Sequence, residues 1–160
     1  MTQYLATGVT REAVYTALAT KIQTTLGLNS LVRGWPILQN VDISQSPTGY
    51  LHQNSSKPLQ EKMRRLPPRY VDSVRLWVMV AQQNTDAGIQ NSPSTILNNL
   101  RDLLDLAFES DQGDQHVCTL GGLVEHCWIT DDTVFESIVN SAWTLFRTHI
   151  EVQYFSINNF

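Results

Sequence analysis

The segment LVEHCWITDDTVF, residues 123–135, is dominated by β-branched and aromatic side chains, which favour strands. Gly121 and Gly122 stand directly before it and mark the break at which a strand begins. A second segment of the same kind, AWTLFRTHIEVQY, occupies residues 142–154. Together the two segments predict one antiparallel β-hairpin, and we expect the rest of the chain to be arranged around it.

Side chains in the second segment alternate between two faces. One face would carry Thr144, Phe146, Thr148, Ile150, Val152 and Tyr154, and the other Trp143, Leu145, Arg147, His149, Glu151 and Gln153. This alternation predicts a sheet with one face on the core and a second face that turns polar toward the strand's end. We expect Trp128 and Phe146 to serve the fold, and no residue from 118 to 154 to take part in chemistry.

Three more elements are predicted upstream. Thr10 can cap a helix that ends at Gly27, because Val14, Leu18, Ile22 and Leu26 recur every four residues. A long strand is predicted over residues 70–81, entered from Pro67-Pro68, with alternating apolar side chains. A second helix is predicted over residues 94–108, with these apolar residues at helical spacing: Ile96, Leu97, Leu100, Leu103, Leu104 and Phe108.

The remaining segments are short or polar. Residues 28–35 predict a short strand that Pro36 keeps out of the centre of a sheet. Residues 36–68 predict a long polar loop with one candidate strand at 49–53, and we expect residues 40–62 to be mobile in the free subunit and ordered by a partner. Residues 1–9 form a candidate N-terminal arm. The predicted fold is therefore a single α+β domain over residues 1–160, a mostly antiparallel β-sheet with two main α-helices packed against it.

Composition bounds the function. The chain of 160 residues has two cysteines, no apolar stretch near the ~20 residues of a membrane span and no signal peptide at its start, so we expect it to remain in the cytoplasm where it is made. Its net charge of -4 is unevenly divided: nine basic against four acidic residues up to Val80, and two against eleven beyond it. This +5 and -9 division is either uneven solvated surface or a sign that opposite faces of one subunit attract each other in a ring.

Residues with metal-ligand chemistry are present, but their spacing is poor. His116, Cys118, His126 and Cys127 together could bind zinc. Because His126 and Cys127 are neighbours in a predicted strand, they should point to opposite faces and not reach one ion. The same geometry disfavours a Cys-His nucleophile pair. We therefore expect no metal and no cofactor.

Three other patterns have ordinary explanations. Leu120-Gly121-Gly122 lacks the Lys and Ser or Thr of a phosphate loop and predicts a tight turn. Asp131 and Asp132 are interpreted as surface carboxylates or a bend. A basic cluster made of Lys57, Lys62, Arg64, Arg65 and Arg69 could contact DNA phosphates, but a protein interface or a solvated loop is favoured. The candidate interface joins this cluster to acidic residues of the second helix: Asp102, Asp105 and Glu109.

Three stretches resemble recurring segments of one protein family. They are TLGGLVEHCWI at residues 119–129, TREAVYTAL at residues 10–18 and LPPRY at residues 66–70. They occur in the family's order in a chain of the family's size, so the resemblance spans residues 10–154. On these segments the chain resembles the tail terminator proteins of long-tailed bacteriophages, the group that includes the minor tail protein U type.

This resemblance implies a structural virion protein with no enzymatic role. Such a protein forms a ring, typically a hexamer, at the head-proximal end of the tail tube, ends tube polymerisation and offers the surface for head-tail joining. Its implied partners are copies of itself, the tail tube protein, a neck protein and, in a contractile tail, the sheath protein, while DNA passes through the ring without sequence-specific binding. The alternatives are a head-completion or neck protein between portal and tail and, from another class, a small hydrolase or metal-binding enzyme.

Overall fold

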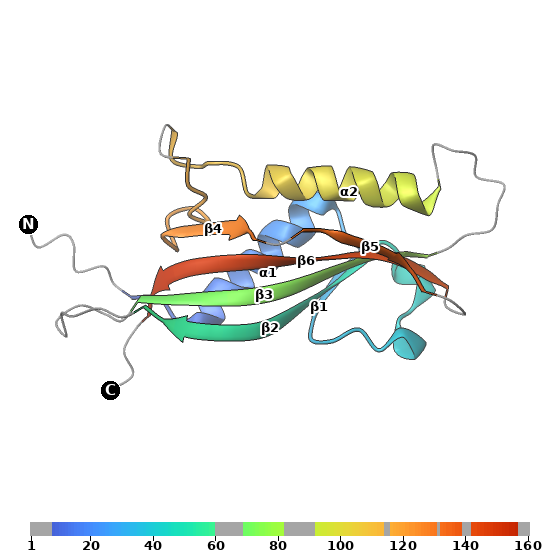
Figure 1. Ribbon diagram of the computed structural model, residues 1–160, viewed down its shortest axis with the longest axis horizontal. Helices are drawn as coiled ribbons and strands as arrows, with labels where there is room; N and C mark the ends of the chain where they lie inside the picture. Colours follow the sequence, from blue (N-terminus) through green and yellow to red (C-terminus); the bar gives the residue numbers. More distant parts are fainter. Residues whose placement is uncertain are drawn as a thin grey trace, which may run out of the picture.

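The computed structural model describes residues 8–59, 69–81, 92–113, 116–130, 132–138 and 142–156, which form two α-helices on one mixed sheet (Figure 1). The elements are, in chain order, α1 (Arg11–Leu26), β1 (Ser30–Arg33), the 3-10 turns η2 (Leu38–Asn40) and η3 (Ile43–Gln45), β2 (Thr48–Pro58), β3 (Arg69–Ala81), α2 (Pro93–Ala107), β4 (His126–Ile129), β5 (Val134–Ser137) and β6 (Trp143–Phe155). The predicted α+β class is confirmed. None of the described helices is long and apolar enough to cross a membrane.

Local chemistry sets the ends of both helices. The Thr10 side chain accepts the Ala13 N–H at the start of α1, and Gly27 ends the helix in the left-handed conformation at φ 66°. Ser92 caps α2 by accepting the Thr95 N–H, and Pro93 occupies the first turn. The predicted bounds of α1 are confirmed, and those of α2 are correct to within one residue.

The sheet is centred on β3 and β6. Its strand order is β1-β2-β3-β6-β4, with β5 also paired to β6; only the β1–β2 pair is parallel. The predicted final hairpin is present, but its first arm is divided between β4 and β5. Ile129 faces Ile150 and Val134 faces Arg147, so the register against β6 shifts by two residues between β4 and β5.

Within the predicted loop of residues 36–68, the candidate strand at 49–53 is present but longer than predicted. Residues 48–58 form an eleven-residue strand, β2, that pairs with β3 along its length, whereas the sequence indicated only a candidate strand at 49–53. The expectation that residues 40–62 are mobile in the free subunit and ordered by a partner stays a prediction, although residues 48–58 of that range are paired strand. The second half of the strand was not predicted because it is polar and lies where one sheet face is open to solvent. The rest of the predicted loop, residues 60–68, and residues 1–7 of the predicted arm fall outside the described ranges.

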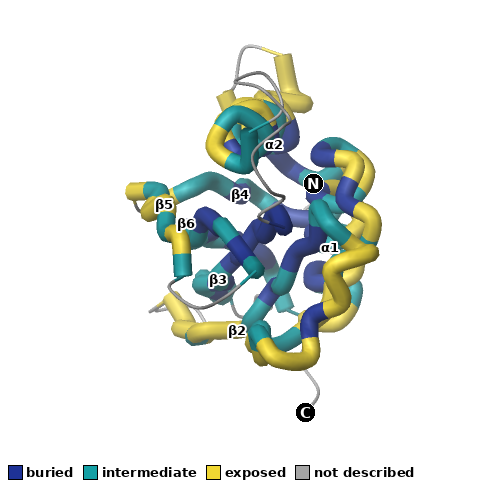
Figure 2. The backbone as a smooth tube through the Cα atoms, turned by 90° about the vertical axis from the view of Figure 1, so that its right-hand side faces the viewer, coloured by how far each residue is buried: buried dark blue, intermediate teal, exposed yellow. Residues whose placement is uncertain are grey.

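Both helices cover the same face of the sheet, and the opposite face is only partly covered (Figure 2). Under the helices lies the main core, to which β3 contributes Val74, Leu76, Val78 and Val80, and β6 contributes Phe146, Ile150, Val152 and Tyr154. On the second face a smaller core forms where residues 35–45 cross the sheet: Val41, Trp77, Met79, Ala81, Trp143 and Leu145. The predicted division of β3 and β6 into two faces is confirmed.

Trp128 does not lie in the main core. It is half-buried on the second face and stacks on His126 with 4.8 Å between ring centroids. Its strand neighbour Cys127 is fully buried under the helices. Because neighbours in a strand point to opposite faces, a buried Cys127 places Trp128 outside the main core.

Candidate assembly interface

The two cysteines lie side by side under the helices, and both are reduced. The Cys127 N–H donates to the Cys118 carbonyl at 2.9 Å, and the Cys118 N–H donates to His126 Nδ1 at 3.1 Å. A hydrogen bond from the Cys127 thiol, opposed by burial, lowers the pKa of Cys118 to about 7. The same thiol-thiol contact and burial raise the pKa of Cys127. Each thiol also donates to a backbone carbonyl, Cys127 to Cys118 at 3.5 Å and Cys118 to Ala107 at 3.8 Å.

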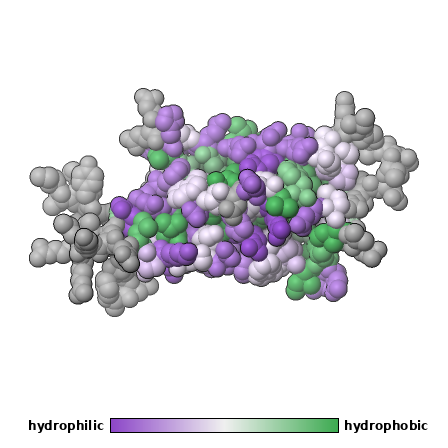
Figure 3. Space-filling view, in the orientation of Figure 1, coloured by the Kyte–Doolittle hydropathy of each residue, from purple (hydrophilic) through white to green (hydrophobic). Residues whose placement is uncertain are grey.

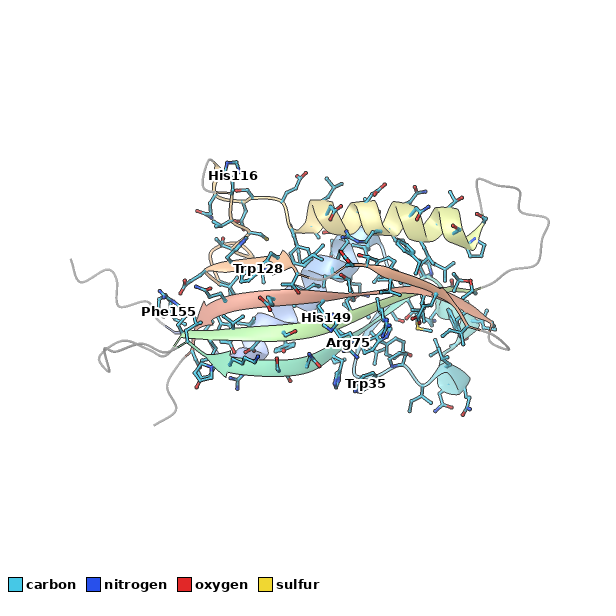
Figure 4. The ribbon with its side chains drawn as sticks, in the orientation of Figure 1. Trp35, Arg75, His116, Trp128, His149 and Phe155 are labelled. Atoms are coloured by element: carbon cyan, nitrogen blue, oxygen red, sulfur yellow. The ribbon has the colours of Figure 1, made fainter. Side chains whose placement is uncertain are left out.

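The candidate zinc ligands are not brought together in the described part of the chain. Among the residues that the structure describes, no group of three His, Cys, Asp or Glu side chains is placed to hold an ion. His126 and Cys127 lie on opposite faces of β4, as their adjacency predicts. His116 is exposed and stands apart from the β4 strand (Figure 4).

Gly121 and Gly122 form the predicted tight turn, with φ of 74° and 91°. The Asp111 carboxylate accepts the N–H groups of Thr119 and Gly121 at 2.8 and 3.0 Å. Burial raises the pKa of Asp111 while these hydrogen bonds lower it, and the net shift is downward. The turn borders a groove of about 500 Å³ against α1, lined by Lys21, three threonines of α1 and Cys118, among others. Asp111 therefore stabilises the turn by accepting its N–H groups.

The acidic pair of the sequence is only partly described. Asp132 is exposed, and Asp131 is outside the described residues.

The three segments that resemble the terminator family meet at one end of the sheet. Arg11, at the start of α1, lies over the Tyr70 ring with 5.2 Å from Cζ to the ring centroid. Arg69, at the start of β3, donates to Glu125 Oε1 at 2.6 Å. These contacts join residues separated by about 50 to 60 positions in the chain, so the quoted segments form one structural unit.

A buried carboxylate anchors that unit. Asp72 has no exposed surface, and its Oδ2 accepts the Tyr154 O–H at 2.8 Å and the Arg11 Nε–H at 3.3 Å. Burial and the bond to Asp72 raise the pKa of Tyr154 to about 12. Among the described residues, Asp72 Oδ1 has no hydrogen-bond partner. The cluster ties α1, β3 and β6 together around a carboxylate that has no exposed surface, while the Arg11 side chain stays 43% exposed.

The basic cluster of the sequence is only partly described. Lys57 is exposed on β2, and Arg69 is engaged by Glu125 and lies over the Phe155 ring at 4.6 Å. Lys62, Arg64 and Arg65 lie outside the described residues. The structure therefore leaves Lys57 exposed but uses the guanidinium of Arg69 within the subunit.

The acidic residues of the candidate interface do share one helix face. Asp102, Asp105 and Glu109 are exposed on and just beyond α2, three and four residues apart. Asp105 pairs with Arg101 at 2.6 Å, and Arg101 also donates to Thr133. Leu106 lies within this face and is 51% exposed. We call Asp102, Leu106 and Glu109 the acidic helix face.

Sequence reasoning missed a second surface, at the border of the open sheet face. Trp35, Ile37 and Ile43 are 53%, 59% and 52% exposed on the segment that crosses the sheet, and we call these residues, with Arg75 and His52, the aromatic patch. In Figure 4, Trp35 and Arg75 lie near His149 on the face of the sheet drawn toward the viewer. The signal in the sequence was an apolar run interrupted by Pro36, but the approach of Arg75 depends on tertiary structure.

No family model matches the chain, and no curated protein matches it. Among solved structures, it is similar to a chain in a structure described as the virion of a native gene transfer agent particle. The identity is 9% and the TM-score 0.48, over 96% of this chain and 98% of that chain. So distant a likeness says nothing by itself about function.

Proposed function

We propose that this chain is a structural protein of a phage-like virion that assembles into a ring of six at the head-proximal end of the tail tube. There it ends tube polymerisation and presents the surface to which the head joins. Its partners are further copies of itself, the tail tube protein and a neck protein, with a sheath protein where the tail contracts. Assembly takes place in the host cytoplasm, and DNA passes through the ring without sequence-specific contacts.

One observation carries the proposal: the three segments that resemble tail terminators meet in the folded chain. Arg11 contacts Tyr70, and Arg69 contacts Glu125, so each segment touches another at the same end of the sheet. A chance likeness of separate short strings gives no reason for them to converge. The convergence favours a shared fold unit, and with it the role that the resemblance implies.

Exposed apolar side chains support an assembly role. Trp35, Ile37 and Ile43 leave half or more of their surface in water although they come from one short segment. Scattered exposed hydrophobic residues are ordinary, but neighbouring ones beside an arginine and two histidines have the composition of a protein interface. A closed ring needs two different complementary surfaces on each subunit, and this chain offers an aromatic and an acidic one.

Electron microscopy of particles assembled without this chain tests the role. We expect tails of uncontrolled length that carry no heads, because nothing would stop tube growth. Tails of normal length that fail to join heads would instead indicate a neck or head-completion protein. Joined particles of normal length would contradict both roles. Native mass spectrometry of the purified chain should show a closed ring with about six times the 18.1 kDa subunit mass.

A further inference from the structure

The exposed Trp35 ring of the aromatic patch is held in place by contacts with other aromatic side chains. The Trp35 ring packs on His52 and on Trp77, with centroids 4.6 and 4.8 Å apart, although the side chain is 53% exposed. Trp77 itself is buried beneath it. An aromatic side chain that is fixed from below and open above loses little conformational freedom when a partner covers it.

Arg75 adds an oriented positive charge to this patch. Its Nε–H donates to His149 Nε2 at 3.0 Å, and its Cζ lies 5.5 Å from the Trp35 ring centroid and 5.6 Å from that of Trp77. Within the described ranges, Arg75 forms no ion pair. Charges beside the patch are engaged: Arg147, which stands opposite Trp77 in the register of β3 and β6, pairs with Glu136, and Asp42 caps the η3 turn through the Ser44 N–H.

The acidic helix face has the complementary chemistry. Asp102 and Glu109 are exposed and, among described residues, form no ion pair, while Leu106 lies between them with half its surface in water. Arg101, the cation nearest in sequence, is engaged by Asp105. The face therefore combines two carboxylates that form no ion pair within the described residues with one apolar side chain, a match for one arginine beside exposed aromatic and aliphatic groups.

The two surfaces are on opposite sides of the subunit. In Figure 1, α2 runs along the top, and the turns η2 and η3, which belong to the segment carrying the aromatic patch, lie at the bottom. Figure 3 shows green, apolar atoms at this lower corner. Surfaces so separated cannot meet within one copy, but they can meet between copies in a head-to-tail contact.

We propose that the aromatic patch of one copy receives the acidic helix face of the next, with Arg75 facing Asp102 and Glu109, and Leu106 packing against Trp35 and Ile37. The contact rests on the proposed ring and names the surfaces that build it. Its positive side is Arg75, since Arg69 of the basic cluster is already neutralised by Glu125. Three apolar side chains around a single arginine favour a protein occupant over a polyanion.

Charge-reversal variants of the full chain test this contact by native mass spectrometry and light scattering over a range of concentrations. Arg75→Glu alone, and Asp102→Arg with Glu109→Arg, should each raise the concentration for half assembly about tenfold or more, because like charges then face each other. Combining all three changes in one chain should recover most of the lost assembly. Trp35→Ser and Leu106→Lys should also weaken assembly, because each removes an apolar side chain of the contact while Arg75, Asp102 and Glu109 stay in place.

Matched controls separate this contact from general charge effects. Lys57→Glu and Asp132→Arg reverse exposed charges on other parts of the surface and should leave assembly unchanged. Melting curves of each variant at low concentration confirm that the subunit is folded. If every variant assembles as well as the wild type, the proposed contact is wrong, but the proposed ring is not contradicted. The same conclusion follows if the single and double variants assemble poorly and the triple variant does not recover assembly. A folded wild-type chain that stays monomeric at every concentration would overturn the ring and this contact together.

Discussion

The two faces of the sheet differ in how completely they are covered. Under α1 and α2, Phe146 and Ile150 have no exposed surface, and even the carboxylate of Asp72 is buried with partners from two other elements. On the opposite face a crossing segment covers only part of the sheet and leaves Trp35 and Ile37 largely in water. Folding of one copy buries the apolar side chains of the first face. The second retains apolar surface that folding of one copy does not use, which points to assembly.

The largest expected effect is on the covered face. Phe146→Ala should lower the free energy of unfolding by about 3–5 kcal/mol, because a buried ring is replaced by a cavity. The half-buried Trp128 on the other face is the matched control, and Trp128→Ala should cost clearly less. Urea denaturation of both variants measures the difference. Equal losses would mean that the second face is as tightly packed as the first.

Asp72 should show the next largest effect. Asp72→Ala should cost about 1–3 kcal/mol, since Tyr154 and Arg11 lose their acceptor and the tyrosine hydroxyl stays buried. Tyr154→Phe removes that hydroxyl, so the double variant should cost less than the two single losses added together. Strict additivity in this double-mutant cycle would contradict a direct bond between the two side chains.

Much of the fold was predictable because its signals are local. Thr10 and Gly27 set the ends of α1 through their own backbone chemistry, and alternation in β3 and β6 assigned each side chain to its face. β2 was underestimated because polar residues such as Lys57 fill a strand whose outer face meets water. The aromatic patch could not be predicted, since Trp35 follows β1 and approaches Arg75 of β3 only through the pairing of β1 with β2 and of β2 with β3.

A smaller loss is expected at the cysteines. Cys127→Ser should lower the free energy of unfolding by about 1 kcal/mol, because a small hydroxyl replaces a buried thiol beside the Cys118 carbonyl that can accept its proton. The ring should still form, since Cys127 is fully buried and belongs to neither proposed contact surface. Thermal melts and native mass spectrometry check the two halves of this prediction. A stable variant that no longer assembles would show that the thiol has a role beyond packing.

The same pair should give a weak pH dependence. Cys118 has a pKa of about 7 in the folded chain, below its unfolded value near 9, so the folded state binds fewer protons between these values and stability should rise with pH there. Above that range the raised pKa of Cys127 reverses the sign, because the folded state keeps a proton that the unfolded state has lost. Urea denaturation from pH 6 to 10 measures this change. Replacing both thiols with alanine should flatten it, and an unchanged profile would remove the thiols as its source.

The most direct test of the assembly account is hydroxyl-radical footprinting of the tryptophans in free subunits and in assembled particles. Trp35 is the exposed one, and buried Trp143 serves as an internal reference that should stay unreactive in both states. We predict that Trp35 is oxidised readily in the free subunit and is strongly protected after assembly, because the next copy covers it. Equal oxidation of Trp35 in the two states would contradict the claim that the open face of the sheet is where copies meet.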